Sequence, residues 1–244
     1  MVRPYPTALW RASTGEASVK RTRAFEDVLA QIERRIADDG LTVGDRLPGE
    51  RQLAEQLGVG RSSVREALRV LETLGVVSSQ AGRGPDAGAV LTSRPDTALT
   101  DLLRLNLGLS TLEQREVIDA RLMIERWSAA RAAATGAGTE ALAAAIEGMD
   151  RAGSAEEFVE HDTAFHCAIA DASGNRLIAA VMRSLRDAMR RNSVEAVERL
   201  GDTSGLRADH ERIRAAIAAG AADEAERAVS DHLAHAYPAL FPDH

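Results

Sequence analysis

The stretch that most constrains the fold is GERQLAEQLGVGRSSVREALRVLETLG, residues 49–75, in which two short amphipathic segments flank a Gly-Val-Gly turn. Gly58 ends the first segment and Gly75 ends the second, while Ser62 or Ser63 can cap the start of the second. Apolar side chains recur at helical spacing in both segments: Leu53, Ala54 and Leu57, then Val64, Ala67, Leu68 and Leu71. Two short helices that bury these faces against each other across a tight turn form a helix-turn-helix.

The flanking segments complete a small mixed domain. Residues 22–39 repeat apolar side chains at helical spacing, which predicts a helix ahead of the helix-turn-helix. Residues 76–80 and 87–93 are typical of two short strands around a loop rich in Gly and Pro. We therefore predict a winged helix-turn-helix over residues 22–94. Residues 1–21 have early prolines and no long apolar run, so we expect a flexible arm there and no signal peptide.

The remaining residues, 95–244, have the pattern of a different domain. Hydrophobic residues make up 45 % of the sequence but aromatic residues only 3 %, so the core must be built mainly from Leu, Ala, Val and Ile, which favours helices. Amphipathic segments separated by glycines follow one another: residues 97–107, 111–135, 138–150, 155–171, 175–199, 203–219 and 221–236. The sequence predicts a mostly α protein, in which a winged helix-turn-helix precedes an antiparallel all-helical bundle.

Charge is distributed unevenly between the two parts. Residues 1–94 carry 14 Lys and Arg against 12 Asp and Glu, whereas residues 95–244 carry 16 against 25. A basic part in an acidic chain points to a polyanion such as DNA, although a difference this small also arises by chance. Side chains on the second short helix that lie outside its apolar stripe suit phosphates and base edges in the major groove: Arg61, Ser62, Ser63, Arg65 and Arg69. A solvated helix face is the simpler alternative.

The single cysteine, Cys167, excludes an intrachain disulfide and fits a reducing compartment. The sequence has no apolar run of the length that a membrane-spanning helix needs. We therefore expect a cytoplasmic protein with no membrane partner.

Histidines and a carboxylate in the helical part form a candidate metal site. Asp162 and His166 stand four residues apart and therefore share one face of a helix. His210 and His232 lie on two later helices, each beside apolar neighbours. Three imidazoles and one carboxylate suit a divalent ion, with Zn²⁺, Ni²⁺ and Mn²⁺ as candidates. Ordinary surface or capping roles are the alternative and arise more often by chance. The other histidines are assigned to the surface: His161, His235 and His244.

The segment LPGERQLAEQLGVGRSSVREALRVLETLGVV, residues 47–77, resembles the DNA-binding signature of GntR-type transcriptional regulators. By this resemblance three arginines contact DNA, two serines hold phosphates and one glycine forms the wing tip: Arg51, Arg61, Arg65, Ser62, Ser63 and Gly82. The chain departs from the family pattern at Gly60, where the family usually has Ser or Thr, and in its longer, glycine-rich wing.

The helical part resembles the FCD ligand-binding domain of the FadR branch of the same family. EVIDARLMIERWSAARAAA, residues 116–134, is similar to its first conserved helix, and DTAFHCAIADASGN, residues 162–175, to its central one. Metal-binding members use an Asp, a His four residues later and two further His, which correspond here to Asp162, His166, His210 and His232. The resemblance implies that Arg121 and Asn175 line an effector pocket beside the metal, and that residues 95–244 bind the effector and dimerise.

Together these features predict a ligand-responsive transcriptional regulator and no enzyme. We expect a repressor that binds a near-palindromic double-stranded DNA operator as a homodimer, because one recognition helix reads too few bases for a unique site. A small organic acid bound at the metal would release the repressor from its operator. Three alternatives stay open: a metal-dependent hydrolase with Glu125 as a general base, a regulator that senses an acyl-CoA without metal, and a helical partner-binding scaffold.

Overall fold

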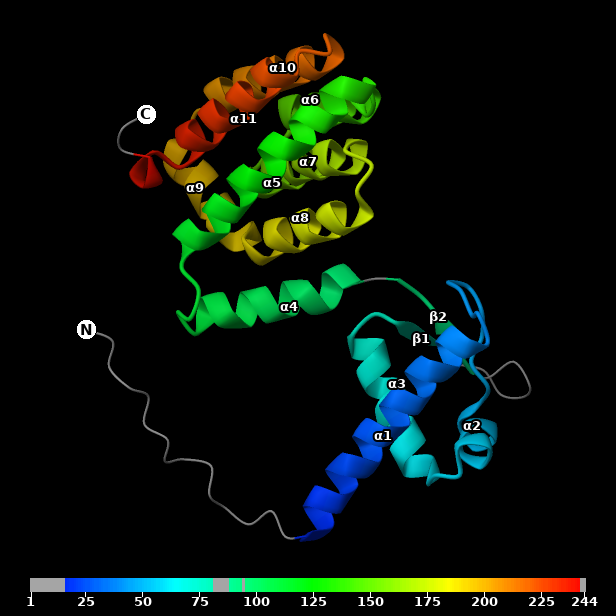
Figure 1. Ribbon diagram of the computed structural model, residues 1–244. Helices are drawn as coiled ribbons and strands as arrows, with labels where there is room; N and C mark the ends of the chain where they lie inside the picture. Colours follow the sequence, from blue (N-terminus) through cyan, green and yellow to red (C-terminus); the bar gives the residue numbers. More distant parts are fainter. Residues whose placement is uncertain (1–15, 81–87, 94, 242–244) are drawn as a thin grey trace. The chain divides into compact units, whose positions relative to one another are not determined.

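The computed structural model describes residues 16–80, 88–93 and 95–241, and the chain divides into two compact units, Met1–Arg94 and Pro95–His244 (Figure 1). Within the described ranges, the first unit combines helices with a two-stranded hairpin, and the second consists of helices. The prediction of a mostly α chain, with a winged helix-turn-helix before a helical bundle, is confirmed.

The first unit has the element order of a winged helix. Its described elements are α1 (Glu16–Asp38), α2 (Glu50–Leu57), α3 (Arg61–Thr73), β1 (Val77–Gln80) and β2 (Gly88–Leu91). β1 pairs antiparallel with β2, with Val77 opposite Leu91. On its other edge β2 forms an isolated bridge from Val90 to Arg46. The hairpin thus follows α3 directly, as the wing follows the second helix of this motif.

A small apolar core holds α3 in place. The stripe predicted on α3 is buried, at Val64, Ala67, Leu68 and Leu71. It belongs to one cluster with side chains of α1, α2 and the hairpin, which include Val28, Ile32, Leu53 and Leu91. Burial of one such aliphatic side chain contributes about 1.5–3 kcal/mol, so this core decides which face of α3 remains outside.

Backbone geometry shapes the turn between α2 and α3. Gly58 closes α2 with a φ of 66°, a left-handed conformation that L side chains rarely adopt. Gly60 is the N-cap of α3, so neither Ser62 nor Ser63 has the capping role that we predicted. The helix begins at Arg61, which places both serines inside its first turn.

α1 begins at Glu16, earlier than the predicted start at residue 22, so residues 16–21 of the expected arm are helical. The segment EASVKR contains neither Gly nor Pro, but it lacks the apolar stripe from which the start was predicted. Periodicity therefore detected only the part of the helix that has an apolar stripe in its sequence. Residues 1–15 lie outside the described residues.

The second unit contains eight α-helices and a short 3-10 helix within the described residues: α4 (Pro95–Gly108), α5 (Gln114–Thr135), α6 (Thr139–Arg151), α7 (Ala155–Ala172), α8 (Arg176–Ala188), α9 (Arg190–Leu200), α10 (Ser204–Ala218), α11 (Ala222–Ala236) and η1 (Pro238–Leu240). α5 packs against α7, α10 and α11, and α6 packs against α7 and α10 (Figure 1). Their shared core includes Ile118, Phe165, Ile213 and Leu233. Polar side chains on the inner faces of these helices therefore lie among apolar neighbours.

The helix predicted over residues 175–199 is divided in two at Met189, which has a φ of −92° and a ψ of 0°. The surrounding segment, RDAMRRN, contains neither Gly nor Pro, so no local signal marks the break. The Met189 side chain is fully buried in a cluster with Val117 and Leu185. Tertiary packing thus ends α8 here and directs α9 against α7.

None of the helices in the described ranges is both long enough and apolar enough to cross a membrane.

Candidate metal centre and nucleic-acid interface

Four polar side chains from three helices meet inside the second unit. Asp162 and His166 lie one turn apart on α7, His210 lies on α10 and His232 on α11. One potential ligand atom from each lies within 4.8 Å of the other three. The ring centroids of His210 and His232 are 4.3 Å apart, and those of His166 and His232 are 5.1 Å apart. The structure therefore brings together all four residues that the sequence suggested.

Most nitrogens of these rings lack a well-formed hydrogen bond, although carboxylate oxygens lie near several of them. Nε2 of His210 lies 3.0 Å from Oδ1 of Asp162, and Nε2 of His166 lies 3.4 Å from the same oxygen. In the described part of the chain, the ring nitrogens of His166 and His210 and Nδ1 of His232 make no hydrogen bond of favourable geometry. A buried polar atom without a partner costs about 1–3 kcal/mol. A divalent ion bound by three imidazoles and a carboxylate would remove this cost, so the residues fit a metal.

Glu125 on α5 holds one of the histidines. Its Oε2 lies 2.5 Å from Nδ1 of His166, and its Oε1 accepts a hydrogen bond of 2.9 Å from Nε of Arg121. Arg121 is fully buried and also donates from Nη1 to the Tyr237 hydroxyl at 3.2 Å. A carboxylate on Nδ1 leaves Nε2 of His166 facing Asp162, the arrangement that metal-ligating histidines commonly have.

Arg186 on α8 is a site residue that sequence reasoning missed. It is 3 % exposed, forms an ion pair with Oδ2 of Asp162 and donates to Oγ1 of Thr163 at 3.1 Å. Oδ1 of Asp162 faces the histidines, so Arg186 holds the carboxylate by its other oxygen. Arginine is common throughout the chain, and nothing in the sequence distinguishes this one.

Asp209 on α10 was also missed. Its Oδ2 lies 2.7 Å from Nδ1 of His235 and 3.8 Å from Nδ1 of His232, and its Oδ1 accepts a hydrogen bond of 2.8 Å from Arg212. His235, which we assigned to the surface, therefore takes part in a polar cluster although 43 % of its side chain is exposed. Asp209 directly precedes His210, but adjacent residues on a helix point in different directions, so the pair gave no usable signal.

Burial and charge together set the protonation of the cluster. Burial alone would raise the pKa of Asp162, but Arg186 and His166 hold it well below its usual range. Burial lowers the pKa of His232 to about 3 and also lowers that of His210. At neutral pH these groups provide an ionised carboxylate and neutral imidazoles, the forms that bind metal ions.

A cavity of about 490 Å³ adjoins the cluster, and its lining includes Arg121, Asp162, Arg186 and His232. Cavities of this size bind small molecules in many proteins. Charged groups from three helices thus border a space that can receive an anion.

Asn175 lies outside this cavity, in contrast to the effector role that the resemblance assigned to it. It is exposed and forms the N-cap of α8, where its Oδ1 accepts hydrogen bonds from the backbone N–H groups of Leu177 and Ile178 at 3.1 and 3.3 Å. The side chain is needed at the helix start, where Asn is among the preferred capping residues.

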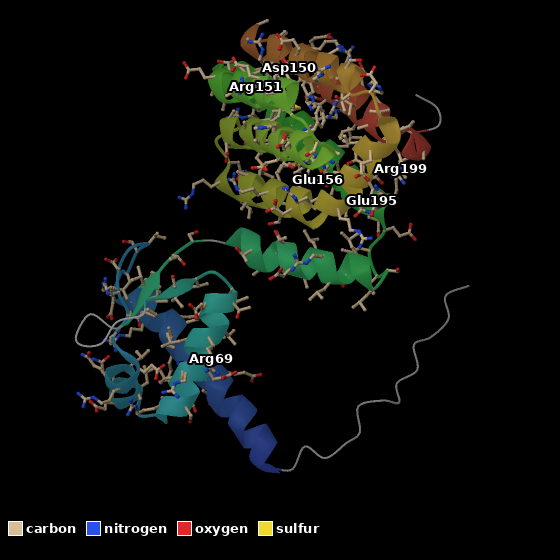
Figure 2. All side chains as sticks on the ribbon, turned by 180° about the vertical axis from the view of Figure 1, so that it is seen from behind. Arg69, Asp150, Arg151, Glu156, Glu195 and Arg199 are labelled. Carbon is tan, nitrogen blue, oxygen red and sulfur yellow. The ribbon has the colours of Figure 1, made fainter. Side chains whose placement is uncertain are left out.

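Residues predicted to contact DNA lie on the outer side of the helix-turn-helix. Arg51, Arg61, Ser62, Arg65 and Arg69 are exposed, and Ser63 is partly exposed; Arg69 is labelled on α3 in Figure 2. Arg65 donates from Nε and Nη2 to Glu50, with N–O distances of 2.9–3.2 Å. Gly82, the predicted wing tip, lies outside the described residues.

Comparison with protein families gives two matches in chain order. The family described as bacterial regulatory proteins, gntR family, matches residues 24–85, and the FCD domain matches residues 116–235. The first range contains the helix-turn-helix, and the second contains all four residues of the candidate metal site.

Individual proteins are similar over most of the chain. The Glc operon transcriptional activator of Escherichia coli K12 is 31 % identical over 229 residues, 88 % of this chain and 87 % of the relative. The transcriptional repressor NanR of Cronobacter sakazakii is 31 % identical over 230 residues, 91 % and 86 % of the two chains. Among solved structures, a Streptococcus agalactiae GntR protein aligns with a TM-score of 0.58 at 24 % identity, over 86 % of this chain and 96 % of its own, which supports the fold.

Proposed function

The chain belongs to the GntR family of bacterial regulatory proteins and carries an FCD domain, and from this premise we propose that a small carboxylic acid, bound beside a divalent metal ion in the helical unit, sets its affinity for DNA. Membership of this family makes it a ligand-responsive, DNA-binding transcriptional regulator. The proposal concerns the residues and the ligand through which it responds.

The observation that carries the proposal is the buried cluster of Asp162, His166, His210 and His232, in which most ring nitrogens make no well-formed hydrogen bond. Three nitrogens and one carboxylate oxygen suit Zn²⁺ or Ni²⁺, and Mn²⁺ is a third candidate. When bound, such an ion would supply a Lewis-acidic positive charge that attracts an anionic oxygen. The four ligands would also tie α7, α10 and α11 together.

Charge in the cavity favours an anionic effector. The buried guanidinium of Arg121 is balanced by Glu125, and that of Arg186 by Asp162. The positive charge of a divalent ion would therefore remain to be offset by the effector. A hydroxy acid or sugar acid offers a carboxylate for this purpose and a neighbouring oxygen for the same ion.

In the first unit, we propose that α3 is the recognition helix of a homodimer that binds a near-palindromic operator. Arg51, Arg61 and Arg65 would contact DNA, while Ser62 and Ser63, in the first turn of α3, would bind phosphates beside backbone N–H groups. Their exposure supports this assignment. Two copies are needed because one recognition helix reads too few bases for a unique site.

We propose that the acid releases the protein from DNA, which makes it a repressor. One relative is named an activator and another a repressor, so family membership leaves both directions available. An effector shifts an equilibrium only by its difference in affinity for two states, typically about 1–3 kcal/mol. The expected loss of DNA affinity is therefore about 5–150-fold.

The hydrolase alternative loses support from the geometry. Glu125 is fully buried and its two carboxylate oxygens face Arg121 and His166, an arrangement that suits a positioning role for this residue better than that of a general base. The family to which the chain belongs consists of transcriptional regulators. An acyl-CoA effector without metal gives no role to four converging metal-ligand side chains.

The test combines metal analysis with DNA binding. An operator is first selected from random duplexes, and its affinity for the metal-loaded protein is then measured by fluorescence anisotropy with a panel of hydroxy acids and sugar acids. At least one acid should weaken binding by about 5–150-fold, and a chelator should abolish this response. If no acid changes DNA affinity, or the response persists after complete metal removal, the proposed function is wrong.

A further inference from the structure

One face of α9 lines the cavity beside the metal cluster. Ser193, Ala196, Val197 and Leu200 stand at positions i, i+3, i+4 and i+7, and all four border the cavity. Three of these four side chains are apolar. Arg199 of the same helix, labelled in Figure 2, also borders the cavity, and its side chain is exposed.

Further apolar side chains reach the same space from other elements. Leu206 comes from the first turn of α10, and Pro238 and Leu240 come from η1. Leu200 is 42 % exposed, which is high for a leucine beside a cavity. When a ligand covers an accessible apolar side chain in a cavity of this size, apolar area is removed from water and binding becomes more favourable.

The volume of the cavity exceeds what a short acid needs. A three-carbon hydroxy acid displaces about 100 Å³, roughly the volume of three water molecules at ~30 Å³ each. The cavity measures about 490 Å³. A short acid held by the metal and the arginines would leave most of the apolar wall in contact with water.

We propose that the effector carries an apolar group about the size of a phenyl ring behind its carboxylate, and that the α9 face together with Leu206 and Leu240 receives this group. This inference rests on the proposed function, since it assumes that a carboxylate binds at the polar wall. A polyhydroxylated body fits less well, because hydroxyl groups placed against Val197, Leu200 and Leu206 would lose water and gain no partner from these three side chains.

Two acids with the same head group test the inference. Lactate and 3-phenyllactate differ only in the phenyl ring, and their affinities for the metal-loaded protein are measured by calorimetry. We expect 3-phenyllactate to bind at least tenfold more tightly, because a buried aromatic ring removes a large apolar area from water. Equal affinities, or tighter binding of lactate, would overturn the inference.

Variants then locate the subsite. Ala196→Phe fills the space beside the α9 face and should reduce the preference for 3-phenyllactate over lactate at least fivefold. Ala144→Phe, an exposed position on α6 that does not line the cavity, is the matched control and should leave the preference unchanged. Thermal melting and metal content confirm that both variants fold. An unchanged preference in Ala196→Phe would place the ring elsewhere and contradict the subsite.

Failure of the inference differs from failure of the proposed function. If both acids bind and weaken DNA binding to the same extent, the proposed function stands and the apolar subsite falls. If neither these acids nor the wider acid panel affects DNA affinity, the proposed function itself falls, and the subsite with it.

Discussion

Arg65 on α3 donates from Nη2 to Oε2 of Glu50 on α2 at 2.9 Å, across the turn that joins the two helices. Nε of Arg65 lies within 3.2 Å of both carboxylate oxygens, so the contact is fork-like. Hydrogen bonding to Arg65 holds the pKa of Glu50 below its usual value. The pair positions the guanidinium but occupies donors that a guanine would use, so base recognition by Arg65 requires Glu50 to release or share it.

Replacing Arg65 by Ala should weaken operator binding by about 1–3 kcal/mol and reduce the preference for operator over a shuffled duplex, because the proposed bidentate contact to guanine would be lost. Fluorescence anisotropy with both duplexes measures the two effects. Arg34→Ala on α1, an exposed position outside the helix-turn-helix, is the control for a general loss of positive charge. If Arg65→Ala keeps the affinity and the sequence preference of the wild type, Arg65 does not recognise bases.

Glu50→Gln should tighten binding to DNA of any sequence by about 1.4- to 5-fold at low salt, since exposed ion pairs contribute roughly 0.2–1 kcal/mol and this one competes with DNA for Arg65. The gain should shrink as salt is raised. Glu33→Gln, an exposed position on α1, removes the same charge elsewhere. Weaker binding by Glu50→Gln would mean that Glu50 serves mainly to hold Arg65 in its reading position.

Metal removal should lower the thermal stability of the helical unit, because the proposed ion would bind residues of three helices in the folded state only. At an ion concentration 1,000 times the Kd, the loss is about 4 kcal/mol. His210→Ala should melt earlier than the wild type and should no longer respond to Zn²⁺ or Ni²⁺, as followed by calorimetry and elemental analysis. His161→Ala, outside the cluster, should keep the response. Melting of the wild type that is indifferent to chelator and to both ions contradicts the site.

Glu125→Gln should lower metal affinity about 10–100-fold, because the carboxylate on Nδ1 orients His166 and increases its basicity. Competition with a chromogenic chelator measures the change. Glu140→Gln, exposed on α6, serves as the control. Retention of wild-type affinity in Glu125→Gln would show that His166 needs no such partner.

Glu125 should also make the metal-free protein sensitive to acid. Burial would raise the pKa of this carboxyl, but His166 and Arg121 lower it below the ordinary value of 4.5. A carboxyl whose pKa is lower in the folded state stabilises the fold above pH 4.5 and loses this contribution as the pH falls. Between pH 4.5 and 3, the free energy of unfolding should fall more steeply in the wild type than in Glu125→Gln. The difference in slope should be about 1.4 kcal/mol per pH unit, because the variant lacks the one carboxyl group that takes up a proton on unfolding. Parallel pH profiles of the two proteins, measured in chelator by denaturant titration, would contradict this role.

Much of the first unit was predictable from local pattern. The buried stripe of α3 and the glycine that closes α2 follow from spacing, because helical periodicity links residues that are three or four apart. Two details were not predictable in this way. Gly60 replaced the serines as the N-cap of α3, and α1 extends to Glu16 without an apolar stripe. Both concern helix starts, where the sequence signals are weakest.

In the helical unit, the break at Met189 shows the limit of local reasoning. Its neighbours favour a continuous helix, and only burial of the Met189 side chain against α5 and α8 explains why α9 departs in a new direction. This break turns Ala196, Val197 and Leu200 toward the cavity. The proposed apolar subsite therefore could not be inferred before the tertiary structure was known.

The sequence by itself determined the class of the protein, the helix-turn-helix and the identity of four candidate metal ligands, because these features are carried by short spacings and by family resemblance. Tertiary structure alone decided the partners of those ligands: Glu125 for His166, Arg186 for Asp162 and Asp209 for His232. Glu125 and Arg186 stand on other helices than the candidate ligands that they contact, and Asp209 likewise lies near a histidine of the next helix. Such contacts depend on how helices pack and which rotamers the core permits, and local periodicity contains no information about either.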